Sequence, residues 1–279
     1  MSLISFQEFD RIYQASVRAV FEHWTTAMQK TIALHCHGWS PGLFDFKNYL
    51  EASSIRFYKA YHHIASQGEN LSVCDVGGFW GVLPLTLKEL GYSVAMTESL
   101  KYYNDSFNAL FDFISGRGVL IFDYDPFEVD AALDKQFDVV TLMAVLEHYP
   151  HSHKTLMKNV SRLMRPDGKL YIEVPNIAYW PKRTGLLMGR TPLAQLADVY
   201  RSDVPFIGHH HEFTIAELRE LARLSGMKVL AEDFYNYTPG SMPDIKMLVR
   251  RPVQFMAFLL LNETRECLAI LCEREGKPE

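Results

Sequence analysis

The sequence predicts an α/β fold in which a parallel β-sheet is covered by helices on both faces. One observation behind this prediction is that apolar runs of strand length alternate with helical segments after Gly68. A second is that these runs are almost continuously apolar, which is typical of strands buried on both faces. A third is a group of glycines directly after the first run, in VCDVGGFWGVLPL at 73–85, where open α/β sheets bind ligands.

The composition is that of a globular protein with a sizeable core. Of the 279 residues, 48% are hydrophobic and 22% are charged, which fits one large domain with a small extension. The net charge of −5 gives no overall attraction to nucleic acid. The longest apolar stretch, FMAFLLL at 255–261, is far shorter than the roughly 20 residues that span a bilayer. The four cysteines include no CxxC pair, so reduced thiols and a cytoplasmic location are expected.

Residues 1–68 are predicted to form an N-terminal helical cap. Ser5 and Glu8 have the spacing of a capping box, which begins a helix. A loop rich in glycine and proline is expected at 35–46 and a second helix at 47–66. An apolar stripe at helical spacing lies in the first helical segment and comprises Val17, Val20, Phe21, Trp24 and Met28.

Residues 69–279 are predicted to form one domain. Strands are expected at 71–76, 92–97, 118–122, 137–143, 169–174, 229–237 and 268–272. Helices are expected at 82–90, 100–115, 152–164, 215–225 and 252–262. The stretch 177–212 interrupts the alternation with mixed Gly, Pro, Trp and Tyr, so an insert is expected after the fifth strand.

The glycines after the first strand indicate a ligand that approaches the backbone closely. They fit neither familiar phosphate loop, because no GxxxxGK[ST] run is present and Phe79 and Val82 occupy two positions of a GxGxxG pattern. Glu98 ends the next strand, where an acid can accept hydrogen bonds from a ribose diol. Asp75 lies inside an apolar strand, where a carboxylate needs a partner. These features together fit a nucleoside without a pyrophosphate.

The order of motifs resembles that of the class I S-adenosylmethionine-dependent methyltransferases, in particular their small-molecule branch. DVGGFWG at 75–81 and SVAMTES at 93–99 resemble the first two motifs of this family, and IFDYDPF at 121–127 resembles the third. The resemblance continues through FDVVTLMAVLEHYPH, LMRPDGKLYIEVPN and GHHHEFTIAELRELARLSGMKV, and it covers about residues 70–237. It implies a Rossmann-like, doubly wound sheet of seven strands that is mostly parallel, with the last strand antiparallel and inserted near the edge.

The resemblance also implies a set of cofactor-binding residues. Asp75 would orient the loop and the cofactor's ammonium group, and Glu98 the ribose. Asp123 and Tyr124 would contact the adenine, although Asp123 equally fits a turn cap. Met143 would lie beneath the sulfonium, although core packing explains it as well. The full set is Asp75, Gly77, Gly78, Phe79, Trp80, Gly81, Glu98, Ser99, Asp123, Tyr124, Met143 and Ala144.

Phe79 departs from the family pattern, since many members have GxGxG and Phe79 holds the middle position. A phenylalanine does not take the positive φ of glycine cheaply. Either the turn therefore runs differently, or Gly78 supplies the conformational freedom one residue earlier.

The acceptor side is predicted from fewer signals. His148 matches the Glu-His ending of the fourth-strand motif, and it fits either a base for a hydroxyl proton or a structural lock at Glu147. Three adjacent histidines on a loop do not converge easily on one ion, so no metal is expected. Residues expected near the acceptor are Tyr102, Tyr179, Trp180, His209, His210 and His211.

The predicted reaction is transfer of a methyl group from S-adenosylmethionine to a small-molecule acceptor. Oxygen is the expected target, because the resemblance extends to O-methyltransferases of quinones, sugars and natural products and the NPPY motif of amine-methylating members is absent. Two alternatives stay open: a non-catalytic nucleoside-binding module of the same fold, and a nicotinamide-dependent oxidoreductase. A homodimer is compatible with the sequence, and no nucleic-acid partner is expected.

Overall fold

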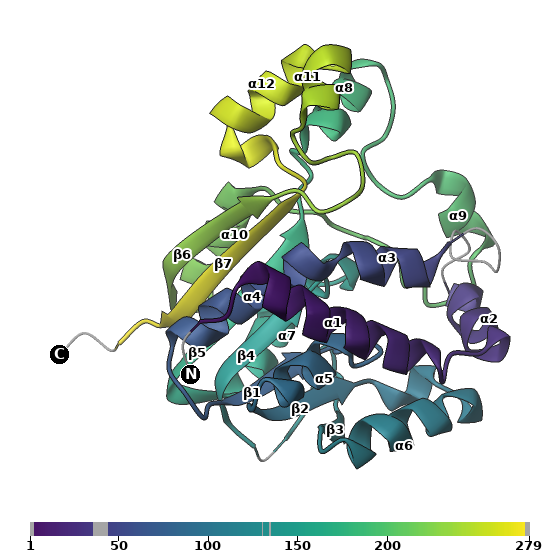
Figure 1. Cartoon of the computed structure of the whole chain (residues 1–279), viewed down its shortest axis with the longest axis vertical. Helices are drawn as coiled ribbons and strands as arrows, with labels where there is room; N and C mark the ends of the chain where they lie inside the picture. Colours follow the sequence, from purple (N-terminus) through teal and green to yellow (C-terminus); the bar gives the residue numbers. More distant parts are fainter. Residues whose placement is uncertain (1–2, 36–43, 130, 134, 277–279) are drawn as a thin grey trace.

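A computed structural model describes residues 3–35, 44–129, 131–133 and 135–276, and its centre is one seven-stranded sheet (Figure 1). The strand order is β3-β2-β1-β4-β5-β7-β6. The five strands β1 to β5 pair in parallel, and β7 is antiparallel to both of its neighbours. The predicted Rossmann-like sheet with an antiparallel last strand near its edge is therefore confirmed. The strands are β1 (Ser72–Val76), β2 (Ser93–Glu98), β3 (Leu120–Asp123), β4 (Phe137–Met143), β5 (Met164–Pro175), β6 (Met227–Tyr235) and β7 (Cys267–Arg274).

The register of the parallel strands brings their carboxyl ends to one edge. Val76 at the end of β1 lies opposite Thr97 in β2 and Leu142 in β4. Glu98 lies opposite Asp123 at the ends of β2 and β3. The turns that follow β1, β2, β3 and β4 therefore emerge side by side, where the predicted cofactor residues lie.

Each face of the sheet has its own hydrophobic core. Successive strand residues point to opposite faces, so Val73 and Val139 join one core while Cys74 and Val140 join the other. The first core includes side chains of α5 (Val82–Glu89) and α6 (Asn108–Gly116). The second includes side chains of α7 (His153–Arg162) and α10 (Ile215–Leu224). Burial on both faces explains why the strands are almost continuously apolar.

The N-terminal helices pack into the first core (Figure 1). They are α1 (Phe6–Phe21), α2 (Thr26–His35), α3 (Phe46–Ala52) and α4 (Ser54–Ser66). The helix predicted at 47–66 is divided at Ser53, whose hydroxyl donates to the Tyr49 carbonyl oxygen at 2.7 Å, a bond that competes with regular helix geometry. Most of the loop predicted at 35–46 lies outside the described residues.

The stretch 177–212 contains two short helices, α8 (Trp180–Leu187) and α9 (Leu196–Arg201). After β6, α11 (Ile245–Arg250) and α12 (Pro252–Leu260) pack beside α8, and these three helices gather at the top of Figure 1. The helix predicted at 100–115 is regular only from Asn108, because two 3₁₀ turns precede it. No helix in the described part of the chain has both the length and the apolar character needed to cross a bilayer.

Candidate active site

A cavity of about 680 Å³ lies at the carboxyl ends of the parallel strands. This volume is within the range of small-molecule sites. The turn after β1 contributes to its wall, and so do residues of α2, α3 and α4 from the N-terminal cap. The cavity is therefore enclosed between the sheet edge and the cap.

The turn after β1 adopts left-handed backbone at Gly77, Phe79 and Gly81, with φ of +67°, +55° and +72°. Gly78 does not have a positive φ. Neither alternative from the sequence is therefore right, because Phe79 itself takes the conformation that glycine favours. Two contacts hold it there: its backbone N–H donates to Glu98 Oε1, and its ring stacks on Trp80 with centroids 3.9 Å apart.

The glycines of this turn are required by close packing. A Cβ on Gly77 would lie 2.9 Å from Val145 Cγ2, and a Cβ on Gly81 would lie 2.7 Å from Ile114 Cδ1. Gly77 and Gly78 line the cavity, whereas Gly81 is not among the lining residues. Gly81 therefore meets α6, and its expected direct contact with the ligand has no support from this geometry.

Glu98 is buried at the end of β2 and uses both carboxyl oxygens. Oε1 accepts from Phe79 N–H, and Oε2 accepts from the Tyr103 hydroxyl at 2.6 Å. Burial raises the pKa of Glu98 to about 8, although the hydrogen bonds from Tyr103 and Phe79 act against this rise. Glu98 lines the cavity and fixes the glycine turn.

Asp75 is also buried and has a partner, as the sequence required. Its Oδ1 accepts from the Thr141 hydroxyl on the adjacent strand at 2.6 Å. Burial raises the pKa of Asp75 to about 7, and the Thr141 hydrogen bond opposes this effect. Both Asp75 and Trp80 line the cavity.

The turns after β2 and β3 carry the predicted adenine contacts. Ser99 and Tyr124 line the cavity, whereas Asp123 is not among the lining residues. The Asp123 side chain accepts from Leu100 N–H at 3.0 Å, so it fastens the neighbouring turn. Asp125 does line the cavity, where its carboxylate accepts from the Ser99 hydroxyl at 3.0 Å. Asp125 also caps the following turn, since its carboxylate accepts from Phe127 N–H at 2.9 Å.

Met143 ends β4, Ala144 follows it, and both line the same cavity as Gly77. Ala144 has a left-handed backbone with a φ of +52°. Its N–H donates to the Glu173 carbonyl oxygen at 2.9 Å, which anchors this turn to β5. The sharp turn leads directly into the 3₁₀ segment Leu146–His148.

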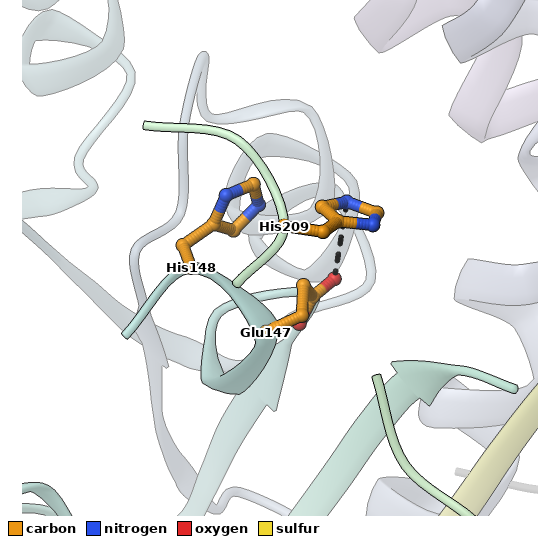
Figure 2. Close-up of side chains that lie close together, drawn as sticks. All are labelled: Glu147, His148 and His209. Atoms are coloured by element: carbon orange, nitrogen blue, oxygen red, sulfur yellow. Dashed lines mark ion pairs between the residues drawn. The ribbon is translucent and has the colours of Figure 1, made fainter. Parts of the chain in front are cut away.

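Figure 2 shows how the side chains of Glu147, His148 and His209 lie close together, and all three residues line the cavity. One ligand atom from each residue lies within 4.8 Å of the other two. Neither oxygen of the fully buried Glu147 has a hydrogen-bond partner among the described residues. Burial raises the pKa of Glu147 to about 7. Burial lowers the pKa of His148 to about 4, so this imidazole is neutral near pH 7.

A buried ion pair beside this group was not found from the sequence. Arg56 of α4 donates from Nε to Glu173 Oε2 of β5 at 2.9 Å, and from Nη1 to the Tyr49 hydroxyl at 2.7 Å. Arg56, Glu173 and Tyr49 all line the cavity. The two charges are far apart in sequence, and although Glu173 lies within LMRPDGKLYIEVPN, nothing in that motif points to Arg56, so only the fold brings them together.

The other predicted acceptor residues divide between two places. Tyr102 and His209 line the cavity, but Tyr179, Trp180, His210 and His211 are not among its lining residues. Tyr179 stacks on Phe258 of α12, with centroids 5.8 Å apart. His211 faces Glu217, with 3.3 Å between its Nε2 and the carboxylate. Adjacent side chains on an extended loop diverge, so the three histidines do not share one site.

Comparison with known proteins identifies the family to which the chain belongs. A family model described as "Methyltransferase domain" matches residues 49–232, which is more than half of the chain. No curated protein matches the sequence.

Solved structures with a similar fold include methyltransferases from three organisms. Magnesium protoporphyrin IX methyltransferase from Synechocystis PCC 6803, solved with bound S-adenosylhomocysteine, is 15% identical with a TM-score of 0.51, over 85% of this chain and 91% of that chain. An S-adenosylmethionine-dependent methyltransferase from Archaeoglobus fulgidus is 15% identical with a TM-score of 0.51, over 79% and 93%. Another from Methanosarcina mazei is 17% identical with a TM-score of 0.50, over 77% and 98%. At these identities the likeness shows the fold alone.

Proposed function

Since the chain belongs to the class I S-adenosylmethionine-dependent methyltransferase family, we propose that it methylates an oxygen of a small-molecule acceptor. The chain is a methyltransferase, and S-adenosylmethionine is its cofactor. This assignment replaces the nicotinamide-dependent oxidoreductase and the non-catalytic module that the sequence left open. When bound, the cofactor supplies an electrophilic methyl group on a positively charged sulfur.

The residues present fit this cofactor. The cavity has the size of a small-molecule site, and its wall contains the backbone of Gly77 and Gly78, which a side chain would obstruct. We assign ribose binding to Glu98, the ammonium group to Asp75, and the adenine end to Ser99 and Tyr124. A bound ribose would exchange for part of the hydrogen bonding that Glu98 has with Phe79 and Tyr103.

The acceptor is assigned to the Glu147, His148 and His209 end of the cavity. The observation that carries this proposal is that one continuous cavity contains both this group and the glycine turn. Since His148 Nδ1–H donates to the Ile207 carbonyl oxygen at 2.7 Å, its Nε2 keeps a lone pair. We assign to His148 the role of activating the acceptor hydroxyl through Nε2.

The stretch 177–212 is proposed to shape the acceptor pocket, because Phe206, Ile207 and His209 near its end line the cavity. A small acceptor is preferred to nucleic acid because the chain has a net charge of −5 and the site is enclosed by the cap. Cys74, Cys267 and Cys272 are buried free thiols, which supports the expected cytoplasmic location.

The proposal is tested first by calorimetric titration with S-adenosylhomocysteine, with NAD and NADP as controls. Micromolar binding of S-adenosylhomocysteine alone is expected, and equal binding of NAD would contradict the assignment. A panel of phenols and sugar alcohols is then assayed for release of S-adenosylhomocysteine. His148→Ala is expected to lower turnover at least tenfold while keeping cofactor affinity, and His210→Ala serves as its matched control. A wild-type rate for His148→Ala would remove His148 from the reaction.

A further inference from the structure

Glu147 is a buried carboxylate without a hydrogen-bond partner among the described residues. Its side chain is fully buried, and neither oxygen accepts a hydrogen bond from the residues that the structure describes. A carboxylate taken out of water without compensation is strongly disfavoured, and buried carboxylates are normally paired, hydrogen-bonded or bound to a metal. His209 Nε2 is the nearest cationic candidate, but at 3.9 Å from Glu147 Oε1 it is too distant for a hydrogen bond. Glu147 is therefore placed for a ligand that the described part of the chain does not provide.

Two histidines present unused nitrogen atoms to the same point (Figure 2). His148 Nδ1–H donates to Ile207 O at 2.7 Å, and His209 Nδ1 lies 2.9 Å from Glu212 Oε1. Glu212 is held in turn by Lys182. Hydrogen bonds of this kind at Nδ1 fix the tautomer and the ring orientation of metal-binding histidines. Nε2 of each ring is left with a lone pair.

We propose that Glu147, His148 and His209 bind one divalent transition-metal ion at the acceptor end of the cavity. Ligand atoms in a tetrahedral site with bonds of about 2.1 Å lie about 3.4 Å apart. The three atoms here lie within 4.8 Å of one another, so small side-chain rotations are enough to close the site. Two imidazoles and one carboxylate suit Zn²⁺, Co²⁺ or Mn²⁺. The sequence did not predict this site, because only His209 of the three adjacent histidines faces Glu147 and His148.

A site with three protein ligands keeps positions open for a further oxygen. These positions face the cavity, since Glu147, His148 and His209 all line it. An acceptor hydroxyl bound there loses its proton to solvent more readily. Its oxygen then forms the new bond to the methyl carbon, while the carbon–sulfur bond breaks and its electron pair stays on sulfur. With an ion present, His148 activates the hydroxyl through the metal. The role of the ion in activating the hydroxyl rests on the proposed methyl transfer. The binding of the ion does not depend on that proposal.

The test is a titration of chelator-treated protein with Co²⁺, followed by visible absorption, and with Zn²⁺, followed by calorimetry. One ion per chain is expected, with the intense visible bands of Co²⁺ at low coordination number. Glu147→Gln and His209→Ala are each expected to weaken binding at least 100-fold. Glu212→Ala, which removes the acceptor of His209 Nδ1–H, is expected to weaken it about 10- to 100-fold. His211→Ala changes a neighbouring histidine outside the group and is expected to bind like the wild type.

Binding of S-adenosylhomocysteine is measured on the same samples, because it reports folding and tests the proposed function separately. Absence of saturable Co²⁺ and Zn²⁺ binding by a protein that binds S-adenosylhomocysteine would overturn the metal site alone. Equal metal affinity of wild type and Glu147→Gln would also overturn it. Metal binding without any cofactor binding would retain the site and contradict the methyl-transfer assignment.

An independent observation concerns the helices α8, α11 and α12, which lie together away from the sheet (Figure 1) and carry exposed apolar side chains. Its side chains include Leu187, Ile245, Val249, Val253 and Leu260, each between 66% and 88% exposed. Apolar surfaces of this kind mark interaction sites. Residues 180–190 and 244–263 hold six Lys or Arg against two Asp or Glu, and one of the six, Lys182, is paired with Glu212. This part is therefore basic although the whole chain has a net charge of −5.

We propose that this apolar surface docks on an anionic lipid surface. Exposed leucines and valines beside basic residues match the acyl and headgroup layers of such a membrane. The positive charge of this surface favours an anionic membrane over a second copy of the chain. Two copies that met through this surface would bring like charges together.

Flotation with vesicles of phosphatidylglycerol and phosphatidylcholine tests this second inference. Binding is expected with the anionic vesicles, weaker binding at 0.5 M salt, and little binding to pure phosphatidylcholine. Val249→Asp with Leu260→Asp is expected to reduce the bound fraction at least fivefold, whereas Leu224→Asp on α10 serves as the matched control. Two results would overturn the proposal: no binding to anionic vesicles, or a dimer in solution that the double variant separates.

Discussion

At the residue scale, several side chains of the candidate site have more than one task. Glu98 lines the cavity, fixes Phe79 through its backbone N–H, and accepts from the Tyr103 hydroxyl. The ribose contact proposed for Glu98 is therefore combined with holding the glycine turn. Substitutions here are expected to change loop geometry and affinity together.

Glu98→Ala is expected to weaken binding of S-adenosylhomocysteine by about 1–3 kcal/mol, the scale of leaving a buried hydrogen-bonding group without its partner. Tyr103→Phe removes only the hydroxyl bound to Oε2 and is expected to have a smaller effect. Calorimetric titration of the wild type, Glu98→Ala and Tyr103→Phe with S-adenosylhomocysteine measures both changes in affinity. An unchanged affinity in Glu98→Ala would show that the ribose is bound elsewhere.

The buried carboxyl groups predict that stability decreases as the pH rises from about 4 to about 8. Burial raises the pKa of Asp75 to about 7 and that of Glu98 to about 8, so the folded chain holds protons that the unfolded chain has released. The free energy of unfolding then falls as pH rises toward these values, by up to about 1.4 kcal/mol per pH unit for each group. Denaturation of the cofactor-free protein at pH 6.5 and 8.5 measures this. Glu98→Gln is expected to flatten the dependence, and an identical slope would contradict the assignment.

Phe79 allows a test of the left-handed turn. A non-glycine residue at positive φ costs roughly 1–2 kcal/mol, and its ring stacks on Trp80. Phe79→Gly loses the ring but removes the strain, whereas Phe79→Ala loses the ring and keeps the strain. Phe79→Gly is therefore expected to be more stable than Phe79→Ala by roughly 1 kcal/mol in chemical denaturation. The opposite order would mean that φ at this position is negative.

At the scale of elements, one ion pair fastens the cap to the sheet. Arg56 lies on α4 and Glu173 on β5, and both are buried. The pair therefore fixes how the cap covers the cavity.

Arg56→Met is expected to destabilise the fold by about 3–5 kcal/mol, because Glu173 would be left buried without its partner. The double variant with Glu173→Met is expected to recover much of this loss, since it removes both charges. Denaturation of the two single variants and the double variant forms a cycle. Strict additivity of the two effects would show that the charges do not interact.

The elements that the sequence predicted correctly are those with a local signal. Strands with continuous apolar runs and the glycine turn were placed within a few residues. The sequence did not predict the helix interruption at Ser53, because it depends on a single hydrogen bond from the Ser53 hydroxyl to the Tyr49 carbonyl oxygen. The cavity side chains Arg56 and Glu173 were missed because their contact exists only after folding. Tyr179 and Trp180 are predicted near the acceptor but do not line the cavity. The composition of an insert does not tell in which direction its chain runs.

At the scale of the whole molecule, the cap and the sheet share one core. Trp24 of the cap contacts Trp80 of the glycine turn, with ring centroids 4.2 Å apart. Side chains of α1 and α4 belong to the same hydrophobic cluster as those of α5. The predicted division at residues 68 and 69 is therefore expected to separate parts that do not fold independently.

Unfolding of the whole chain is expected to be one cooperative transition, in which tryptophan emission and far-UV circular dichroism change together. S-adenosylhomocysteine at 100 times its dissociation constant is expected to add about 2.7 kcal/mol to the free energy of unfolding. Two separated transitions would contradict a shared core and support independent units.

The position of β7 has a consequence for the newly made chain. β6 pairs only with β7 among the described strands, and β7 lies between β5 and β6. During translation, β6 therefore leaves the ribosome before its partner exists, and β5 presents an open edge until residues 267–274 have emerged. Open edges are templates for aggregation, so this interval is when the nascent chain most needs a chaperone.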